Sequence, residues 1–355
     1  MDAVVLVGGQ GTRLRPLTVH TPKPMLPVAG VPFLTHQLAR ARAAGVDHVV
    51  LATAYKPEVF QAHFGDGAAL GLDLEYVTET EPLGTGGGIR NVADRLRAGP
   101  DDPVVVLNGD VLSGHDLRRQ LAVHAAGGAD VTLYLTEVAD ARAFGCVPTD
   151  AAGRVTAFLE KMPEPVTNRV NAGCYVFRRR VIDAIPAGRP VSVERETFPG
   201  LLAEGAVVLG YVDLAYWLDL GTPAALVQGS RDLVLGRVGS PVVPAAAEAL
   251  LGPGVSVPDG ATVTGGSALG SGVVVAPGAC VTGSVVLDGA RIGPEAQVRD
   301  SVVGRGARIG AGTVLDGAVV GDGAVVGAGN ELRCGVRIWC DVVLPDRAVR
   351  FSSDC

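Results

Sequence analysis

A six-residue spacing of aliphatic side chains runs through the last third of this chain. Glycine and other small residues fill most of the positions between them. The regular positions are Val257, Val263, Leu269, Val275, Val281, Leu287, Ile292, Val298, Val303, Ile309, Leu315, Val320, Val326, Leu332, Ile338 and Leu344. The spacing shortens by one residue at 287–292, 298–303 and 315–320. Because a single repeat cannot bury its own apolar face, such repeats stack and share one continuous core.

The pattern resembles the hexapeptide repeat of left-handed parallel β-helices. That resemblance implies a β-helix domain at 254–355, with about eighteen residues in a coil and roughly five coils. Some β-helices of this kind are acyltransferases, whose chemistry usually needs a histidine general base near the coils. The histidines all precede the repeat, at His20, His36, His48, His63, His115 and His124. The sequence therefore argues against acyl transfer and favours a domain that packs onto the rest of the chain or joins the subunits of a homo-oligomer.

The first residues of the chain hold a second strong pattern. An apolar run at 3–7 ends in a glycine-rich loop that reads GGQGTR at 8–13. A short apolar run bounded by glycine predicts a buried parallel strand, and the loop after such a strand lies at the ligand-binding edge of an open α/β sheet. Glycine lets the backbone approach an anion, and Arg13, Arg15 and Lys23 add positive charge. The loop is predicted to bind a polyphosphate, whereas the glycines alone would also suit a plain turn between strand and helix.

Strand-like and helix-like segments then alternate up to Gly236. Helices are predicted at 31–44, at 57–63 and from the glycine-rich turn at 84–88 up to Leu96, and strands at 49–53, 74–78, 104–107 and 131–135. This rhythm is typical of βαβ units and predicts an α/β fold with a Rossmann-like, mainly parallel sheet. After Gly236 a stretch rich in proline and alanine precedes the hexapeptide repeat. We therefore expect an α/β domain at 1–236, a linker at 237–253 and the β-helix at 254–355.

Acidic residues follow two of the predicted strands. Glu79 and Glu81 precede a glycine-rich turn that opens a helix, where free N–H groups suit an anion. A flexible hinge with surface glutamates is the plainer alternative. Asp110 follows the strand at 104–107, a place where aspartate is often only a helix cap or turn residue. The residues of these two segments alone do not show whether they bind a ligand or only shape a hinge or a turn.

Two motifs near the amino end supply that wider pattern. The stretches GGQGTRLRPLT at 8–18 and PKPMLP at 22–27 resemble the signature of the sugar-phosphate nucleotidyltransferases. Further matches to that family are ETEPLGTGG at 79–87, FG at 144–145, FLEK at 158–161, NAG at 171–173 and WLDLGTP at 217–223. The resemblance implies a catalytic domain whose first half binds the nucleotide and whose second half binds the sugar phosphate.

The same resemblance implies a role for individual residues. Those implied to bind the nucleotide are Leu6, Gly8, Gly9, Gly11, Thr12, Arg13, Lys23, Glu79, Glu81, Pro82, Gly84, Thr85 and Asp110. Those implied to bind the sugar phosphate are Gly145, Glu160, Lys161, Asn171 and Asp219. The implied catalytic residues are Arg13, Lys23, Asp110 and Lys161. The implied cofactor is Mg²⁺, with Asp110 and Asp219 as its carboxylate ligands.

The implied reaction joins a nucleoside triphosphate to a sugar 1-phosphate and releases pyrophosphate. No general base is needed, because a phosphate monoester with a second pKa near 6 is already charged at neutral pH. Glu79 and Glu81 favour guanine, since one carboxylate can accept both N–H groups on the edge of that base. We therefore expect GTP as the nucleotide, and the resemblance implies mannose 1-phosphate as the sugar substrate. Glucose-1-phosphate thymidylyltransferase or another nucleotide-sugar pyrophosphorylase is the alternative. A non-catalytic regulatory subunit is less expected, because Arg13, Lys23 and both aspartates are present.

Composition narrows the partners and the location. A net charge of −7 argues against nucleic acid as a partner. No apolar stretch approaches the ~20 residues that span a bilayer, and the amino end does not look like a signal peptide. The six cysteines include no CxxC pair. We therefore expect reduced thiols and a cytoplasmic protein that binds small molecules, with neither a membrane nor a nucleic-acid partner.

Overall fold

The structure is a computed structural model that describes residues 1–350. The chain forms two compact units that are interleaved in sequence. The first unit consists of Met1–Gly9 and Gln37–Trp217, and the second consists of Gln10–His36 and the chain from Leu218 onward. Helix α1 (Phe33–Ala43) begins in the second unit and continues into the first. The segment that follows the first glycines therefore packs with the C-terminal part of the chain.

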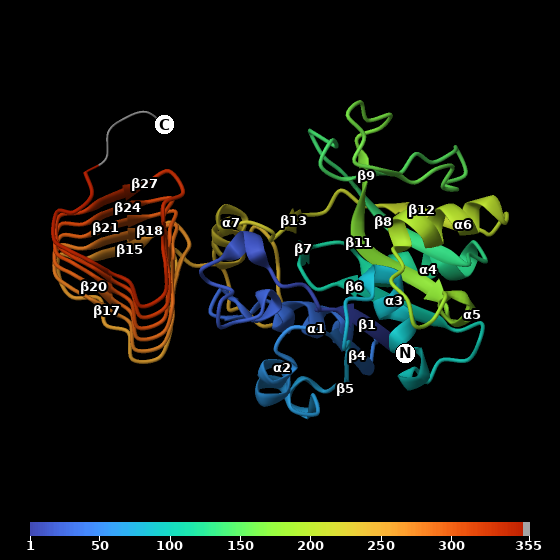
Figure 1. Cartoon of the computed structure of the whole chain (residues 1–355), viewed down its shortest axis with the longest axis horizontal. Coiled ribbons are helices and arrows are strands. Elements are labelled where there is room, and N and C mark those ends of the chain that lie inside the picture. Colours follow the sequence, from blue (N-terminus) through green and yellow to red (C-terminus); the bar gives the residue numbers. More distant parts are fainter. Residues whose placement is uncertain (351–355) are drawn as a thin grey trace. The chain divides into compact units, whose positions relative to one another are not determined.

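A nine-stranded mixed sheet forms the centre of the first unit (Figure 1). The strand order is β10-β9-β11-β6-β1-β4-β5, with β8 paired to β11 and β12 paired to β8. The bounds are β1 (Asp2–Leu6), β4 (His48–Thr53), β5 (Asp73–Thr78), β6 (Pro103–Asn108), β8 (Val131–Glu137), β9 (Gly145–Cys146), β10 (Leu159–Glu160), β11 (Arg169–Arg178) and β12 (Val208–Val212). Strand β1 is parallel to β4 and β6, whereas β11 is antiparallel to β6 and β8. The Rossmann-like prediction is confirmed, with antiparallel strands added on one side of a parallel centre.

The first unit contains five further α-helices, of which two are predicted above; the one after the glycine-rich turn ends at Asn91 instead of Leu96. Their bounds are α2 (Pro57–Phe64), α3 (Gly84–Asn91), α4 (Leu117–Ala126), α5 (Arg179–Ala184) and α6 (Phe198–Ala203). The main core contains Val4 of β1, Val106 of β6, Ile89 of α3 and Phe177 of β11, all with no exposed area. Strands β1 and β6 are apolar throughout their middle residues because both of their faces are covered, which is the property that the uninterrupted runs predicted.

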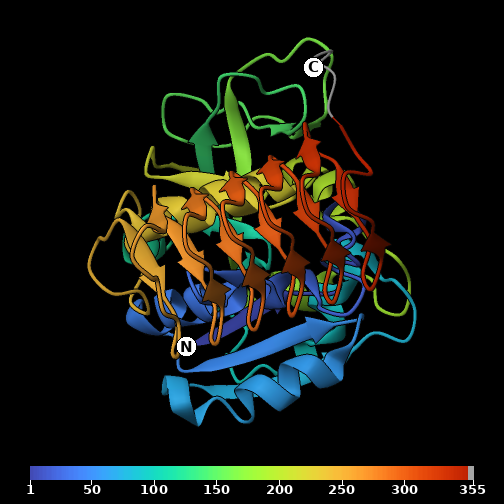
Figure 2. The same ribbon diagram turned by 90° about the vertical axis from the view of Figure 1, so that its left-hand side faces the viewer.

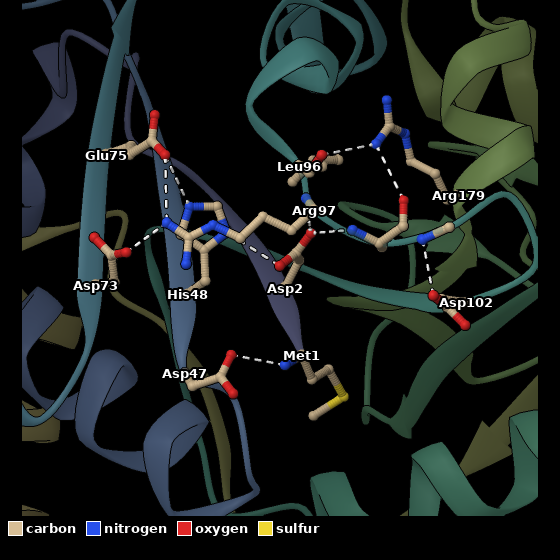
Figure 3. Close-up of polar contacts among 12 residues, drawn as sticks. Met1, Asp2, Asp47, His48, Asp73, Glu75, Leu96, Arg97, Asp102 and Arg179 are labelled. Atoms are coloured by element: carbon tan, nitrogen blue, oxygen red, sulfur yellow. Dashed lines mark hydrogen bonds and ion pairs between the residues drawn. The ribbon is translucent and has the colours of Figure 1, made fainter.

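Buried charges hold the amino ends of the parallel strands together (Figure 3). Asp2 begins β1, and its Oδ1 lies 3.0 Å from Nδ1 of His48. Its Oδ2 accepts hydrogen bonds from the main-chain N–H groups of Arg97 at 2.5 Å and Ala98 at 2.8 Å. His48 Nε2 lies 3.2 Å from Oε1 of Glu75. Asp2 is 3% exposed and His48 is 1% exposed, so water cannot replace these partners.

We expect the variant Asp2→Ala to lower the free energy of unfolding by about 3 kcal/mol, because it leaves His48 and two N–H groups without their acceptor in a buried site. Urea denaturation followed by circular dichroism measures this loss. Asp94→Ala is the control, since Asp94 is 94% exposed in its ion pair with Arg90. The control should lose less than about 0.5 kcal/mol. Equal losses in the two variants would contradict a structural role for the Asp2 cluster.

The second unit contains a three-sided stack of parallel strands, seen from the side in Figure 2. One sheet contains β14 (Ala249–Leu251), β16 (Ser267–Leu269), β19 (Val285–Val286), β22 (Val302–Val303), β25 (Val319–Val320) and β28 (Arg337–Ile338). The next contains β15 (Thr262–Thr264), β18 (Cys280–Thr282), β21 (Gln297–Arg299), β24 (Val314–Asp316) and β27 (Glu331–Arg333). The third contains β17 (Val274–Val275), β20 (Arg291–Ile292), β23 (Arg308–Ile309), β26 (Val325–Val326) and β29 (Val343–Leu344). The predicted left-handed parallel β-helix is confirmed.

One repeat position was predicted one residue too late. Strand pairing aligns Leu269 with Val286 and Val286 with Val303, and Val286 rather than Leu287 belongs to the β-helix core. The first shortening of the period therefore falls between Val281 and Val286. Both candidates are aliphatic and both are buried, so the pattern alone could not choose between them.

A ladder of buried serines marks the corner where the coil is shortened. The N–H of Ser284 donates to Oγ of Ser267 at 3.1 Å, and the N–H of Ser301 donates to Oγ of Ser284 at 3.1 Å. The N–H of Ala318 continues the ladder to Oγ of Ser301 at 3.0 Å. Each hydroxyl satisfies a backbone donor of the following coil that would otherwise be buried without a partner. The serines recur every 17 residues, which is the coil length in this part of the helix.

The cysteines follow the prediction with one exception. Cys146, Cys174, Cys280 and Cys340 are free thiols. Cys334 is bonded in a disulfide, so the expectation of a reduced thiol is wrong for that residue, and no sequence spacing indicates the bond. Cys355 lies outside the described residues. Within residues 1–350, none of the helices has the length and apolar character needed to cross a bilayer.

Candidate active site

The loop after β1 turns sharply at Gly11 in the second unit. Gly11 has a φ of 60°, and a Cβ added there would lie 3.0 Å from the Cβ of Lys23. A side chain at position 11 would therefore be strained and crowded. A short 3-10 turn at Thr12–Leu14 follows, instead of the longer helix common after such loops. The turn leaves Thr12 and Arg13 exposed and buries Leu14.

Three predicted residues converge in the second unit beside Gly221. The Nζ of Lys23 lies 3.7 Å from Oδ1 of Asp219. A Cβ added to Gly221 would lie 2.6 Å from Nη2 of Arg13 and 3.0 Å from Oδ1 of Asp219. Lys23 is almost fully buried, so its charge is offset by Asp219 and not by water. Because Gly221 has no side chain, the Arg13 guanidinium can lie against its backbone.

In the first unit, Asp110 lies where β6 ends beside β1. The N–H of Gly109 donates to the carbonyl of Leu6 at 2.9 Å, and a Cβ on Gly109 would lie 2.5 Å from that oxygen. Only glycine fits at this position, so the turn before Asp110 is fixed against the end of β1. Gly8 and Gly9 follow Leu6, and Gly9 is exposed with open space around its Cα. The strand ends thus carry an accessible backbone and a carboxylate, as the sequence predicts.

Sequence reasoning missed a residue that supports this turn. The Nε2 of Gln37 in α1 donates to the carbonyl of Asn108 at 2.8 Å and to the carbonyl of Val111 at 3.0 Å. These two carbonyls flank Asp110, so Gln37 fixes the backbone on both sides of the carboxylate. Gln37 is buried, but it follows Thr35 and His36 in a helix with several polar residues, so no pattern in the sequence distinguishes it.

The loop that begins at Glu79 encloses one of its two glutamates. Oε2 of Glu79 accepts a hydrogen bond from the N–H of Leu83 at 3.1 Å, and a Cβ on Gly88 would lie 2.7 Å from Oε1. Burial raises the pKa of the Glu79 carboxyl, while the bond from Leu83 opposes that rise. Glu81 and Pro82 are exposed. The two glutamates therefore differ, with Glu79 held against α3 and Glu81 open to solvent.

Thr85, on the first turn of α3, is already hydrogen-bonded by its surroundings. Its hydroxyl donates to Oε2 of Glu194 at 2.8 Å and accepts from the N–H of Val193 at 3.0 Å. Gly84 before it has a φ of 69°, and a Cβ there would lie 2.7 Å from the carbonyl of Val191. The side chain of Thr85 thus joins the start of α3 to the segment at 191–194, and its main chain is the part left to face a ligand.

Four of the five predicted sugar-phosphate residues lie on or directly after β9, β10 and β11, whereas Asp219 lies in the second unit. Gly145 pairs with Glu160 across the short antiparallel strands, and a Cβ on Gly145 would lie 2.8 Å from Oε2 of Glu160. Lys161 follows with a φ of 52°, and its Nζ lies 3.7 Å from Oε1 of Glu160. The left-handed backbone ends the strand and turns Lys161 into solvent. This exposed amine beside a carboxylate is suited to exchange its partner for a phosphate.

Asn171 lies where β11 bulges. Its Nδ2 donates to the hydroxyl of Tyr175 at 2.8 Å, and its Oδ1 accepts from the N–H of Gly173 at 3.2 Å. Trp217 donates from Nε1 to the carbonyl of Ala172 at 3.1 Å. Sequence reasoning did not single out Trp217 for this group. Its position at the start of the WLDLGTP segment, next to the sequence that carries Asp219, was an available signal.

The two predicted carboxylate ligands are a donor set that suits magnesium. Asp110 follows a buried strand in the first unit, and Asp219 faces Lys23 in the second. Residues 1–350 contain no group of three or more His, Cys, Asp or Glu side chains able to hold a metal by themselves. Mg²⁺ usually takes one or two carboxylates and completes its shell with substrate phosphates and water. Each aspartate is therefore a type of ligand that suits that ion, and each would depend on a bound nucleotide to complete the shell.

Comparison with known proteins shows the family of the chain. The model of the nucleotidyl transferase family matches residues 2–234. The chain belongs to this family. A second model, described as the GMPPB C-terminal domain, matches residues 245–354 and thus the β-helix. The chain is a nucleotidyltransferase with a C-terminal β-helix domain.

Individual relatives agree with the family assignment. The mannose-1-phosphate guanylyltransferase of Mycobacterium tuberculosis is 59% identical over 356 aligned residues, which cover 100% of this chain and 98% of that protein. The Arabidopsis thaliana mannose-1-phosphate guanylyltransferase 1 is 40% identical over 65% of this chain and 64% of its own length. The crystal structure of HddC from Yersinia pseudotuberculosis complexed with GMP-PN is 28% identical, with a TM-score of 0.55 over 65% of this chain and 98% of that chain. Two relatives are thus named as mannose-1-phosphate guanylyltransferases, and the solved structure shares the nucleotidyltransferase fold.

Proposed function

We propose that this chain is a mannose-1-phosphate guanylyltransferase, which transfers GMP from GTP to mannose 1-phosphate and releases pyrophosphate. The observation that carries the proposal is its 59% identity to the Mycobacterium tuberculosis enzyme over the whole chain. That similarity includes the β-helix as well as the nucleotidyl transferase region. The carboxylate of Glu79, at the loop that resembles the base-binding loop of the family, supports guanine as the base.

In the proposed reaction, an oxygen of the sugar phosphate attacks the α-phosphorus of GTP in line with the departing pyrophosphate. The main obstacle is repulsion between two anions, so the protein must position them and neutralise their charge. Arg13 would contact the departing β- and γ-phosphates. Lys23 would contact the α-phosphate, and the exposed Lys161 would contact the incoming sugar phosphate. No histidine, cysteine or serine needs to move a proton in this scheme.

The remaining predicted residues would bind and orient the two substrates. The main-chain groups at Leu6, Gly8, Gly9 and Gly11, together with Thr12, would line the triphosphate. Pro82, Gly84 and Thr85 would contact the nucleoside beside Glu79 and Glu81. Gly145, Glu160 and Asn171 would hold the hydroxyl groups of the sugar. We assign the residues before 237 to catalysis and those from 254 onward to the β-helix; within the predicted linker at 237–253, β14 already pairs with β16 of the β-helix.

Mg²⁺ is the proposed cofactor, held by Asp110 and Asp219. When bound there, it would supply positive charge to the phosphate oxygens. The β-helix is proposed to join the subunits of a homo-oligomer. The proposed location is the cytoplasm, which four free thiols support, whereas the bonded Cys334 does not add to that argument.

A panel of substrates tests the proposal. We expect pyrophosphate release to be at least tenfold faster with GTP and mannose 1-phosphate than with dTTP or ATP and glucose 1-phosphate. The physical reason is that a carboxylate accepts two N–H groups from guanine but meets a carbonyl oxygen of thymine, and a mismatched polar edge in a binding site costs about 1–3 kcal/mol. A coupled assay for pyrophosphate measures each pair of substrates at the same enzyme concentration.

Matched glutamine variants separate the two glutamates. Glu79→Gln should reduce the preference for GTP more than Glu81→Gln does, because the loop encloses Glu79 while Glu81 is exposed. If both variants keep the GTP preference, the base is recognised by other groups. Faster release with dTTP by the unmodified enzyme would replace guanylyl transfer with thymidylyl transfer.

A further inference from the structure

One row of the β-helix faces outward and is nevertheless buried. Core residues alternate with outward residues along each strand. In β19, Val286 points into the core, so the residue before it, Val285, points outward. Strand pairing places this residue in one row with Ala268, Val302 and Val319, and each of the four is at most 3% exposed. Outward residues can be this buried only if another part of the chain covers them. This side of the β-helix is therefore an internal contact of the second unit.

The row changes character at its last strand. Pairing of β25 with β28 puts Arg337 directly after Val319 in the row. Its Nη1 donates to the carbonyl of Arg13 at 2.8 Å and to the carbonyl of Arg15 at 2.7 Å. A charged donor thus replaces an aliphatic side chain where the row reaches the loop that carries Arg13. The sequence shows an arginine at this position of the row, and the structure shows that its side chain binds two main-chain carbonyls of the loop.

Two further contacts join the same part of the β-helix to the same loop. Nη1 of Arg305, in the turn after β22, lies 3.1 Å from Oγ1 of Thr21. Sγ of Cys340, just after β28, lies 3.7 Å from the carbonyl oxygen of Pro16. The segment between Gly11 and Lys23 is therefore fixed from the β-helix side at several points and not by Arg337 alone.

We propose that Arg337 is a positioning residue for the phosphate-binding loop, so that the last full coil of the β-helix sets the conformation of Arg13. The main-chain carbonyl of Arg13 is held by Arg337, while its side chain lies against Gly221 near Asp219. With its backbone fixed, the exposed guanidinium needs to lose less freedom when a phosphate binds, which is how preorganisation improves binding and catalysis. The proposal rests on the proposed function for its effect on turnover but not for its effect on the loop.

The chain offers a matched control for this test. The dipeptide Arg-Ile occurs in β28 as Arg337-Ile338 and in β23 as Arg308-Ile309. In both strands the isoleucine packs with the β-helix core and the arginine is exposed. Arg308 lies on a different sheet of the β-helix from Arg337. Arg308→Ala therefore removes the same side chain from an equivalent strand without touching the loop.

The first measurement is hydrogen exchange of the loop amides in the full-length protein without ligand. Two hydrogen bonds close the turn: the N–H of Leu14 donates to the carbonyl of Gly11, and the N–H of Arg15 donates to the carbonyl of Thr12. Arg337→Ala should raise the exchange rate of peptides covering 11–19 at least fivefold and leave peptides from the β-helix core unchanged. Arg308→Ala should leave the loop peptides unchanged. Equal loop exchange in the wild type and in Arg337→Ala would overturn the proposal whether or not the substrates are correct.

The second measurement is steady-state turnover with GTP and mannose 1-phosphate. We expect Arg337→Ala to lower kcat about tenfold, to change KM for mannose 1-phosphate by less than twofold, and to keep the melting temperature of the Arg308→Ala control. Arg337→Lys should recover part of kcat, because an ammonium group can still donate to a carbonyl. A loss of melting temperature without a change in loop exchange would mean that Arg337 only stabilises the fold. If the wild type releases no pyrophosphate, the proposed function fails and hydrogen exchange alone decides the role of Arg337.

Discussion

Replacing Arg13 by alanine should lower kcat by about 10²–10³ while the protein remains folded. The guanidinium is exposed, so its removal costs little stability, but it provides the positive charge proposed to contact the departing phosphates. The structure places it with Lys23 and Asp219 in one group of the second unit. Rapid-quench measurement of pyrophosphate release, together with the melting temperature, separates loss of chemistry from loss of fold.

Two comparisons make the Arg13 result specific. Arg13→Lys keeps the charge but loses the planar fork, so it should recover only part of the rate. Arg291→Ala, at an exposed position of β20 in the same unit, should retain wild-type turnover. Wild-type turnover in Arg13→Ala would show that the glycine-rich loop does not bind the reacting phosphates.

Changing Asp110 to asparagine should also lower kcat by about 10²–10³, because it removes one of two proposed carboxylates from the group that neutralises the phosphates. The same variant should need a higher Mg²⁺ concentration for half-maximal rate. The main chain around position 110 is held by Gly109 and Gln37, so the shape of the turn should persist. Titration of Mg²⁺ at saturating substrates measures both effects.

A second aspartate provides the control for Asp110. Asp183 forms an exposed ion pair with Arg179 at 2.9 Å, and Asp183→Asn should leave both kcat and the Mg²⁺ requirement unchanged. An Asp110→Asn enzyme with normal turnover and a normal Mg²⁺ requirement would remove this residue from the site. A rate loss without any change in the Mg²⁺ requirement would keep Asp110 in catalysis but not as a metal ligand.

Much of the fold is predictable from local patterns. The runs in β1 and β6 are apolar because these strands are covered on both faces, and the six-residue period of the β-helix arises from its three short sides. The exchange of Val286 for Leu287 shows the limit of such patterns. Two neighbouring aliphatic residues satisfy the same period, and only the strand pairing in the structure shows that Val286 lies in the core.

The candidate site is predictable only where residue type and backbone geometry agree. The apolar run at 104–107 placed Asp110 at a strand end, and the structure shows that Gly109 before it lies in a turn that admits no side chain. The hydroxyl of Thr85 could not be assigned, because its partners at Val193 and Glu194 are distant in sequence. Gln37 and Arg337 were missed for the same reason, since each acts on main-chain carbonyls that no side-chain pattern reveals.

The interleaving of the two units also has a consequence for biosynthesis. The segment Gln10–His36 leaves the ribosome early, but its structural partners in the second unit begin at Leu218. Arg337, which holds the main-chain carbonyl of Arg13, follows it by 324 residues in the chain. A nascent chain must therefore carry the segment Gln10–His36 without its structural partners until the residues from Leu218 onward have been translated.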